Sequence, residues 1–117
     1  MSRSRKGRVL VVDDDANSGR AAADWLLEAG WSVVVAHRCS EAMKAAVAAG
    51  PDHLLVEQKL CDGSGFDLFV RLRARNAALS GVVMTRHGSI AGAVHAMRLG
   101  FRDYLVKPLD CRRLAEH

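Results

Sequence analysis

The chain has 117 residues, a length that supports one domain with a sizeable core and is too short for two. A hydrophobic share of 50% and a charged share of 26% are typical of a soluble globular protein, and no apolar stretch reaches the length that a bilayer-spanning helix needs. Four of the 17 basic residues lie in the first eight positions, and the rest of the chain carries 13 basic and 13 acidic side chains, so the formal charge of +4 does not predict a nucleic-acid-binding surface on the folded part.

Residues 1–8 form a basic segment in which we expect a flexible tail and no signal peptide, because no long apolar run follows the charges. After this tail we expect one domain over residues 9–117, in which short apolar runs alternate with longer segments rich in alanine and leucine. The runs predicted as strands buried on both faces of a parallel sheet are 9–12, 31–36, 54–56, 81–84 and 104–106. The segments predicted as helices are 17–29, 40–49, 64–75 and 89–99, and a fifth helix is expected to begin at 110–117 and to be truncated by the end of the chain.

The predicted helices carry two further signals, one at their ends and one along a face. The polar residues suited to cap their N-terminal ends are Ser40, Ser64, Ser89 and Asp110. In the fourth helix, Ile90, Val94 and Met97 recur with helical spacing, so they predict an apolar stripe that packs against the sheet.

Five alternating strand and helix segments predict an α/β fold with a doubly wound, five-stranded parallel sheet in the order 2-1-3-4-5 and helices on both faces. Functional sites in such sheets lie outside the carboxyl ends of the strands, near the point where the strand order reverses. The polar residues at these ends are Asp13, Asp14, Asp15, Glu57, Thr85 and Lys107. We therefore expect four of the five strand ends to bring acids, a hydroxyl and an amine to one site.

The residue types at these strand ends predict a particular chemistry. Carboxylates gathered at one sheet edge repel one another and need a cation to stay charged, and Mg²⁺ suits such oxygen ligands. A hydroxyl at Thr85 and an ammonium at Lys107 would stabilise the oxygens of a phosphoryl group beside the metal. The set therefore predicts metal-assisted phosphoryl chemistry or its remnant. The alternative is that these acids are solvated helix caps, which is the interpretation we favour for Asp15 alone.

Four segments, in this order and at this spacing, resemble the signature blocks of response-regulator receiver domains, which have a flavodoxin-type, CheY-like fold. They are residues 9–15 (VLVVDDD), 51–65 (PDHLLVEQKLCDGSG), 82–85 (VVMT) and 99–108 (LGFRDYLVKP). Within the family, DGSG at 62–65 and HGSIAGAV at 87–94 are most similar to redox-responding regulators of the RegA/PrrA type. The blocks cover nearly the whole chain, so the resemblance implies a receiver domain over residues 9–117.

The resemblance also implies roles for the matching residues. Asp13 and Asp14 would be the acidic pair that binds a divalent metal, with Asp14 the direct ligand. Glu57 and the backbone carbonyl of Lys59 would be further ligands, so we expect weak Mg²⁺ binding. The other matches are Thr85 as the switch hydroxyl, Tyr104 as the rotating switch aromatic, Lys107 as the phosphate-contacting lysine and Pro108 as the proline after a cis peptide bond.

Glu57 stands where the family has its phosphate-accepting aspartate. Its carboxylate extends one C–C step, roughly 1.5 Å, further than that of an aspartate. A displacement of that order costs about a hundredfold in a reaction that depends on in-line positioning, so we expect no phosphorylation at Glu57. Three interpretations stay open: the carboxylate imitates the phosphorylated state, it neutralises Lys107 at an inactive site, or it is an introduced substitution. Arg86, which follows Thr85, is long enough to cover the pocket or to pair with Glu57.

These features predict a switch or interaction module, and not an enzyme, within a transcriptional regulator of phosphorelay signal transduction. The expected partners are a sensor histidine kinase or another signalling protein, and a second copy of the chain bound through the face of the fourth helix, fifth strand and fifth helix. We expect this domain itself to contact neither nucleic acid nor a membrane. A cytoplasmic location is expected, because Cys39, Cys61 and Cys111 are scattered, lack metal-ligand spacing and suit reduced thiols.

Two other functions fit parts of the sequence. The pattern of Asp13 and Asp15 after an apolar strand resembles the nucleophile motif of haloacid-dehalogenase-like phosphohydrolases, which also use a later threonine and lysine. However, the chain leaves no room for a cap domain, and no acidic pair follows Lys107. An FMN-binding domain fits less well, because three aspartates in the first loop repel phosphate unless a cation intervenes. A small phosphohydrolase is therefore the alternative to the receiver.

Overall fold

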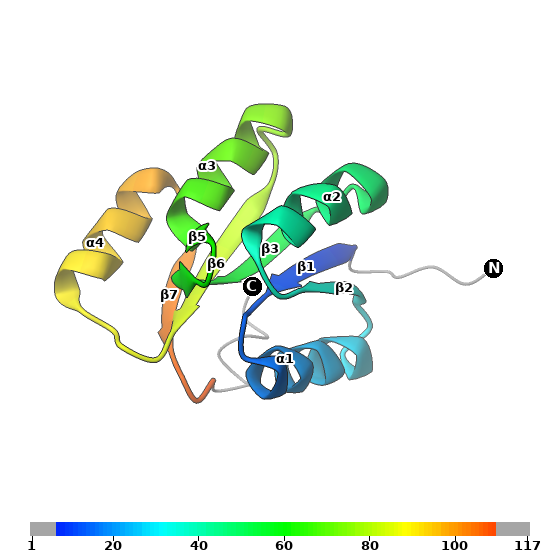
Figure 1. Ribbon diagram of the computed structural model, residues 1–117, viewed down its shortest axis with the longest axis horizontal. Coiled ribbons are helices and arrows are strands. Elements are labelled where there is room, and N and C mark those ends of the chain that lie inside the picture. The colour runs from blue at the N-terminus through cyan, green and yellow to red at the C-terminus, as the bar shows by residue number, and fades with distance from the viewer. Residues whose placement is uncertain (1–6, 110–117) are drawn as a thin grey trace.

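A computed structural model describes residues 7–109, and its central element is a five-stranded parallel sheet (Figure 1). The strands are β1 (Arg8–Val12), β2 (Ser32–Ala36), β3 (His53–Glu57), β6 (Ser80–Thr85) and β7 (Asp103–Val106). Their hydrogen-bonded order is β2-β1-β3-β6-β7, which confirms the predicted order 2-1-3-4-5, because β6 and β7 are the fourth and fifth predicted strands. The order changes direction beside β1 and β3, where sheets of this type place their sites.

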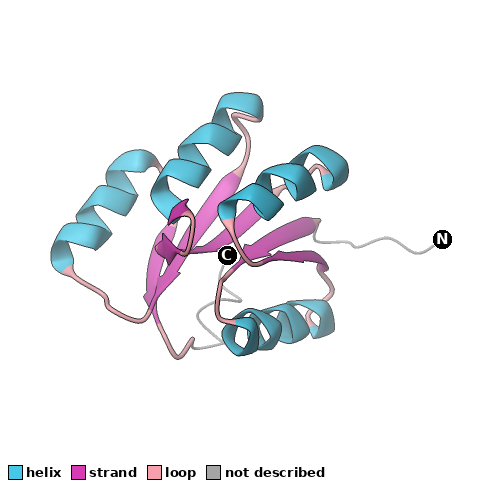
Figure 2. Cartoon of the chain, in the orientation of Figure 1, coloured by secondary structure: helices cyan, strands magenta, loops and turns pink. Residues whose placement is uncertain are grey.

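Helices cover both faces of this sheet, as predicted (Figure 2). In the described part of the chain they are α1 (Ala16–Glu28), α2 (Cys39–Ala49), α3 (Gly65–Arg75) and α4 (Ile90–Leu99). Figure 1 shows α1 on one face and α2, α3 and α4 together on the other. The bounds of the predicted strands and helices differ from the observed ones by one residue at most.

Alternate residues of the strands pack into two separate apolar clusters. Leu10 and Val12 of β1 belong to the cluster under α2, α3 and α4, where Phe69 is fully buried. Val9 and Val11 of the same strand belong to the cluster under α1. Successive side chains of a strand point to opposite faces, so a strand that is apolar throughout can fill both clusters.

The loop after β3 contains a short hairpin that was not predicted, formed by β4 (Lys59–Leu60) and β5 (Gly63–Ser64). The turn of this hairpin also supplies the residue that caps α2, so the prediction of Ser40 as its cap is wrong. The carboxylate of Asp62 accepts hydrogen bonds from the backbone N–H groups of Cys39, at 2.7 Å, and Ser40, at 3.1 Å, so Asp62 and not Ser40 caps this helix. Burial and the neighbouring Asp62 carboxylate raise the pKa of the Cys39 thiol to about 11, which keeps this thiol protonated at neutral pH.

The apolar stripe of α4 faces solvent, so its predicted packing against the sheet is wrong. The exposed fractions are 86% for Ile90, 44% for Val94 and 46% for Met97. The buried positions of this helix are the small residues Gly92 and Ala96. Helical periodicity identifies residues that share a face, but it does not say which face meets the sheet.

The predicted tail and fifth helix lie almost wholly outside the described residues. Asp110 and Cys111 belong to that undescribed part as well. Arg8, which the sequence placed in the tail, is the first residue of β1, and its N–H donates to Asp52 Oδ2 at 2.9 Å. Of the helices within residues 7–109, none combines the length and apolarity that crossing a bilayer requires.

Candidate functional site

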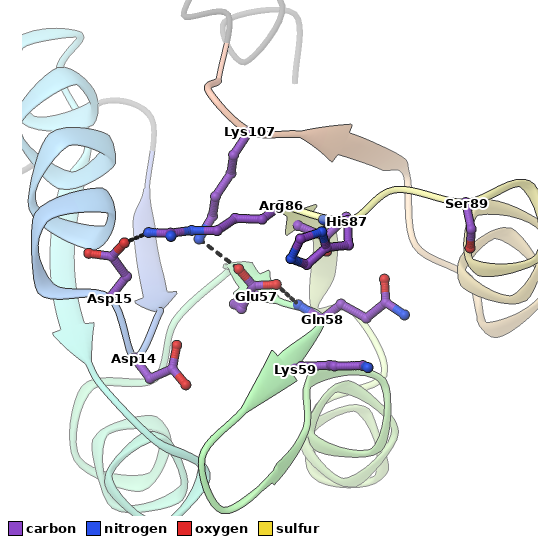
Figure 3. A pocket seen from close by; sticks show the side chains of 10 residues that line it. Asp14, Asp15, Glu57, Gln58, Lys59, Arg86, His87, Ser89 and Lys107 are labelled. Atoms are coloured by element: carbon purple, nitrogen blue, oxygen red, sulfur yellow. Dashed lines mark hydrogen bonds and ion pairs between the residues drawn. The ribbon is translucent and has the colours of Figure 1, made fainter.

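The carboxyl ends of β1, β3, β6 and β7 meet at one edge of the sheet around a pocket of about 510 Å³ (Figure 3). The strand register brings these ends level, since Glu57 pairs with Met84 and Thr85 pairs with Val106. The strand-end residues that line the pocket are Asp14, Asp15, Glu57, Thr85 and Lys107, and Lys59 joins them from the hairpin. The structure therefore brings the predicted residues to one place.

Lys107 forms the electrostatic centre of this pocket. Its Nζ lies 2.7 Å from Asp13 Oδ2 and 2.6 Å from Glu57 Oε1. The exposed side-chain fractions are 7% for Lys107, 0% for Asp13 and 9% for Glu57, so all three charges are shielded from water. A buried carboxylate is costly unless it is paired, and here one ammonium pairs two of them.

Both carboxylate oxygens of Glu57 have partners. Oε1 contacts Lys107, and Oε2 accepts a hydrogen bond from the N–H of Gln58 at 2.8 Å. The backbone of Glu57 is also closely surrounded. A β-carbon on Gly65 would lie 2.2 Å from the carbonyl oxygen of Glu57, which is too close for any residue other than glycine. Gly65 thus allows α3 to begin directly against the end of β3.

The three aspartates after β1 have separate roles. Asp13 is buried, and its Oδ1 accepts from the N–H of Asp15 at 3.0 Å. Asp14 is exposed, and in Figure 3 no dashed contact joins its carboxylate to the other residues drawn. Asp15 caps α1, as expected, by accepting from the N–H groups of Asn17 and Ser18. Within residues 7–109, no group of three or more His, Cys, Asp or Glu side chains is placed to hold a metal ion.

Arg86 crosses the mouth of the pocket and forms an ion pair with Asp15 (Figure 3). The sequence left open whether Arg86 covers the pocket or pairs with Glu57. The observed pairing answers this, because the guanidinium reaches from the end of β6 to the start of α1. The Glu57 carboxylate is left to Lys107.

The two predicted switch residues, Thr85 and Tyr104, form hydrogen bonds with different neighbours. The Thr85 hydroxyl is buried and accepts a hydrogen bond from the N–H of His87 at 3.2 Å. The Tyr104 hydroxyl donates to Gln58 Oε1 at 2.8 Å. Gln58 was not singled out from the sequence, although its position directly after Glu57 was the available signal. The predicted cis peptide bond before Pro108 is confirmed.

Comparison with known families gives a match over almost the whole chain. Residues 9–117 match the response regulator receiver domain. Among curated relatives, the acid tolerance regulatory protein ActR of Rhizobium meliloti is 37% identical over 102 residues, which cover 87% of this chain and 53% of ActR. The photosynthetic apparatus regulatory protein RegA of Cereibacter sphaeroides is 35% identical over 106 residues, which cover 91% of this chain and 58% of RegA. The chain thus spans about half the length of these relatives.

Solved structures agree with this match. A response regulator receiver protein from Pseudomonas putida superimposes with a TM-score of 0.86 at 32% identity, covering 99% of this chain and 95% of that protein. A response regulator from Burkholderia pseudomallei, solved with a phosphorylated aspartic acid, a calcium ion and citrate, gives a TM-score of 0.85 at 31% identity. That alignment covers 92% of this chain and 64% of the other.

Proposed function

The chain belongs to the response regulator receiver domain family, and from this premise we propose that it is the receiver module of a transcriptional regulator in which a permanent carboxylate–lysine pair replaces phosphoryl transfer. The family is a signalling family and not a classical enzyme family, which favours the receiver over the phosphohydrolase alternative. The aligned residues cover only 53% and 58% of the curated relatives, which are regulatory proteins, and this supports an output region elsewhere in the full protein.

The observation that carries this proposal is the contact of 2.6 Å between Glu57 Oε1 and Lys107 Nζ. A phosphate acceptor must present a free carboxylate oxygen in line with the donor, but both oxygens of Glu57 are already engaged. The extra methylene of glutamate lets its carboxylate reach the ammonium that would otherwise stabilise a phosphoryl group. Glu57 therefore satisfies Lys107 without phosphate.

A divalent cation at this site would bind weakly. Asp13, Asp14 and the backbone carbonyl of Lys59 are the groups we assign to it, with Glu57 as a further ligand. They have the oxygen chemistry that Mg²⁺ prefers, and the bound ion would neutralise charge on phosphoryl oxygens. Lys107 already occupies one oxygen of Asp13 and one of Glu57, so the metal has to compete with an ammonium for the same carboxylates.

The partners that fit this role are a sensor histidine kinase or another signalling protein in the cytoplasm, and a second copy of the chain. The apolar side chains of Val94, Met97 and Val106 are between 44% and 53% exposed on α4 and β7, which supports self-association through this face. We assign no nucleic-acid contact to the domain itself.

Substituting Glu57 by alanine is expected to weaken self-association at least about tenfold. The reason is that the Glu57 carboxylate, in this proposal, stabilises the arrangement of α4 that self-associates more than the arrangement that does not. The dissociation constants of the parent and of Glu57→Ala would be compared by analytical ultracentrifugation. Equal constants would mean that Glu57 only neutralises Lys107 and sets no signalling state.

A further inference from the structure

The ring of Tyr104 is held by hydrogen bonds at both sides of its hydroxyl. The hydroxyl donates to Gln58 Oε1 at 2.8 Å and accepts from the N–H of Ser89 at 3.3 Å. The ring is half-buried and packs against the apolar cluster under α2, α3 and α4. Tyr104 thus connects the residue after Glu57 with the start of α4.

Gln58 is itself fixed in place by its backbone. Its N–H donates to Glu57 Oε2, at 2.8 Å, and to the carbonyl of Met84, at 3.0 Å. Its carbonyl accepts from the N–H of Gly65 at 2.8 Å. In Figure 3 the Gln58 side chain extends from the end of β3 toward the Ser89 side of the pocket. The amide oxygen is therefore presented from a rigid support.

The first turn of α4 is fitted closely around the Tyr104 hydroxyl. Ser89 caps this helix, and its Oγ accepts from the N–H of Gly92 at 2.9 Å. A β-carbon on Gly92 would lie 2.6 Å from Tyr104 Oη and 3.0 Å from Ser89 Oγ. Only glycine leaves room for the hydroxyl at this position, so the ring and the helix start share one arrangement.

We propose that Gln58 is a positioning residue that holds Tyr104 against the start of α4 without any phosphoryl group. This inference rests on the proposed function, because it gives the switch aromatic a fixed position in a receiver that lacks the acceptor aspartate. The Thr85 hydroxyl bonds His87, so Gln58 supplies the contact that fixes the Tyr104 hydroxyl on the β3 side. Without that acceptor, a half-buried hydroxyl would lose a partner and the ring would gain freedom.

Tyr104 is the single tyrosine among the 117 residues, which makes a direct test available. Protein labelled with 3-fluorotyrosine gives one ¹⁹F resonance, and it would be compared in the parent, Gln58→Met and Gln58→Glu. Methionine keeps the length of the side chain without the oxygen, whereas glutamate keeps an acceptor oxygen. The resonance of Gln58→Met should move toward that of free fluorotyrosine, and its shift between H₂O and D₂O should grow about twofold as the ring becomes exposed.

Amide hydrogen exchange gives a second measurement on the same three proteins. The Ser89 and Gly92 amides should exchange about tenfold faster in Gln58→Met than in the parent, because the helix start opens more often. Gln58→Glu should resemble the parent in both measurements. Circular dichroism would verify that each variant is folded.

Two results would overturn the proposal. One is a Gln58→Met protein whose ¹⁹F resonance and amide exchange match those of the parent, since packing alone would then hold the ring. The other is a Gln58→Glu protein that behaves like Gln58→Met, since the acceptor would then be irrelevant. All samples contain neither metal nor phosphodonor, so either outcome is independent of whether Glu57 can be phosphorylated.

Discussion

Replacing Lys107 by methionine is expected to lower the free energy of unfolding by about 3–5 kcal/mol, the usual cost of removing one partner from a buried ion pair. The ammonium lies within 2.7 Å of both Asp13 and Glu57. Without it, two carboxylates that are almost completely shielded from water repel each other and have no cation. Urea unfolding followed by circular dichroism measures the loss.

Two further variants test the cause of this loss. Adding Glu57→Gln to Lys107→Met removes one of the two unpaired charges and should recover about 2 kcal/mol. Lys59→Met is the matched control, because Lys59 is an exposed lysine at the same pocket and its loss should cost less than about 0.5 kcal/mol. If the free energy of unfolding of Lys107→Met lay within about 1 kcal/mol of that of the parent, the result would contradict a buried triad of Lys107, Asp13 and Glu57. A loss of that size is what removing a surface ion pair costs.

Replacing Gly65 by alanine is expected to destabilise the chain by about 3 kcal/mol, at the upper end of the usual cost of overpacking. The added methyl group would lie 2.2 Å from the carbonyl oxygen of Glu57 and 3.0 Å from Cγ2 of Val56. The oxygen belongs to the backbone of β3, so it cannot rotate away as a side chain can. Relief requires α3 to move from the end of β3, which disturbs the pocket as well.

Gly50→Asn is a suitable control for Gly65→Ala. Gly50 ends α2 in the left-handed conformation, with a φ of 57°, and apart from its two chain neighbours no residue places an atom within 4 Å of an added β-carbon. Asparagine tolerates this conformation, so the change should cost about 1 kcal/mol or less. The stabilities of both proteins would be compared by thermal unfolding. A Gly65→Ala protein no less stable than Gly50→Asn would contradict the prediction, because it would show that the end of β3 can move to accept the added methyl group.

The fold could be predicted because its signals are local and repeat along the chain. Each buried strand is a continuous apolar run, and the alternation with helices leaves few arrangements of a parallel sheet. The exposure of the apolar stripe of α4 could not be predicted from such local signals. Ile90, Val94 and Met97 share one face of α4, and that face is exposed. The buried side of this helix carries the small residue Ala96, which lets the helix approach the sheet.

The candidate site could be predicted in its members but only partly in its contacts. Strand ends of a parallel sheet converge, so Asp13, Glu57 and Lys107 could be expected together from their positions after strands. The partner of Arg86 could not, because a long side chain on a loop reaches either of two acids and only the three-dimensional arrangement selects Asp15. The capping of α2 by Asp62 could not be predicted for the same reason. Asp62 lies 22 and 23 positions after the residues whose N–H groups it accepts from, and only the folded chain brings them together.

We propose that Glu57 holds Lys107 and accepts no phosphoryl group, and the intact mass of the protein tests this proposal most directly. The parent and Glu57→Asp would be incubated with acetyl phosphate and Mg²⁺ and then weighed by mass spectrometry. We predict an unmodified parent, and one added phosphoryl group on Glu57→Asp, whose shorter arm restores the in-line position. The contradicting result is a parent that gains one phosphoryl group, keeps it when Asp13, Asp14 and Asp15 are substituted, and loses it in Glu57→Gln.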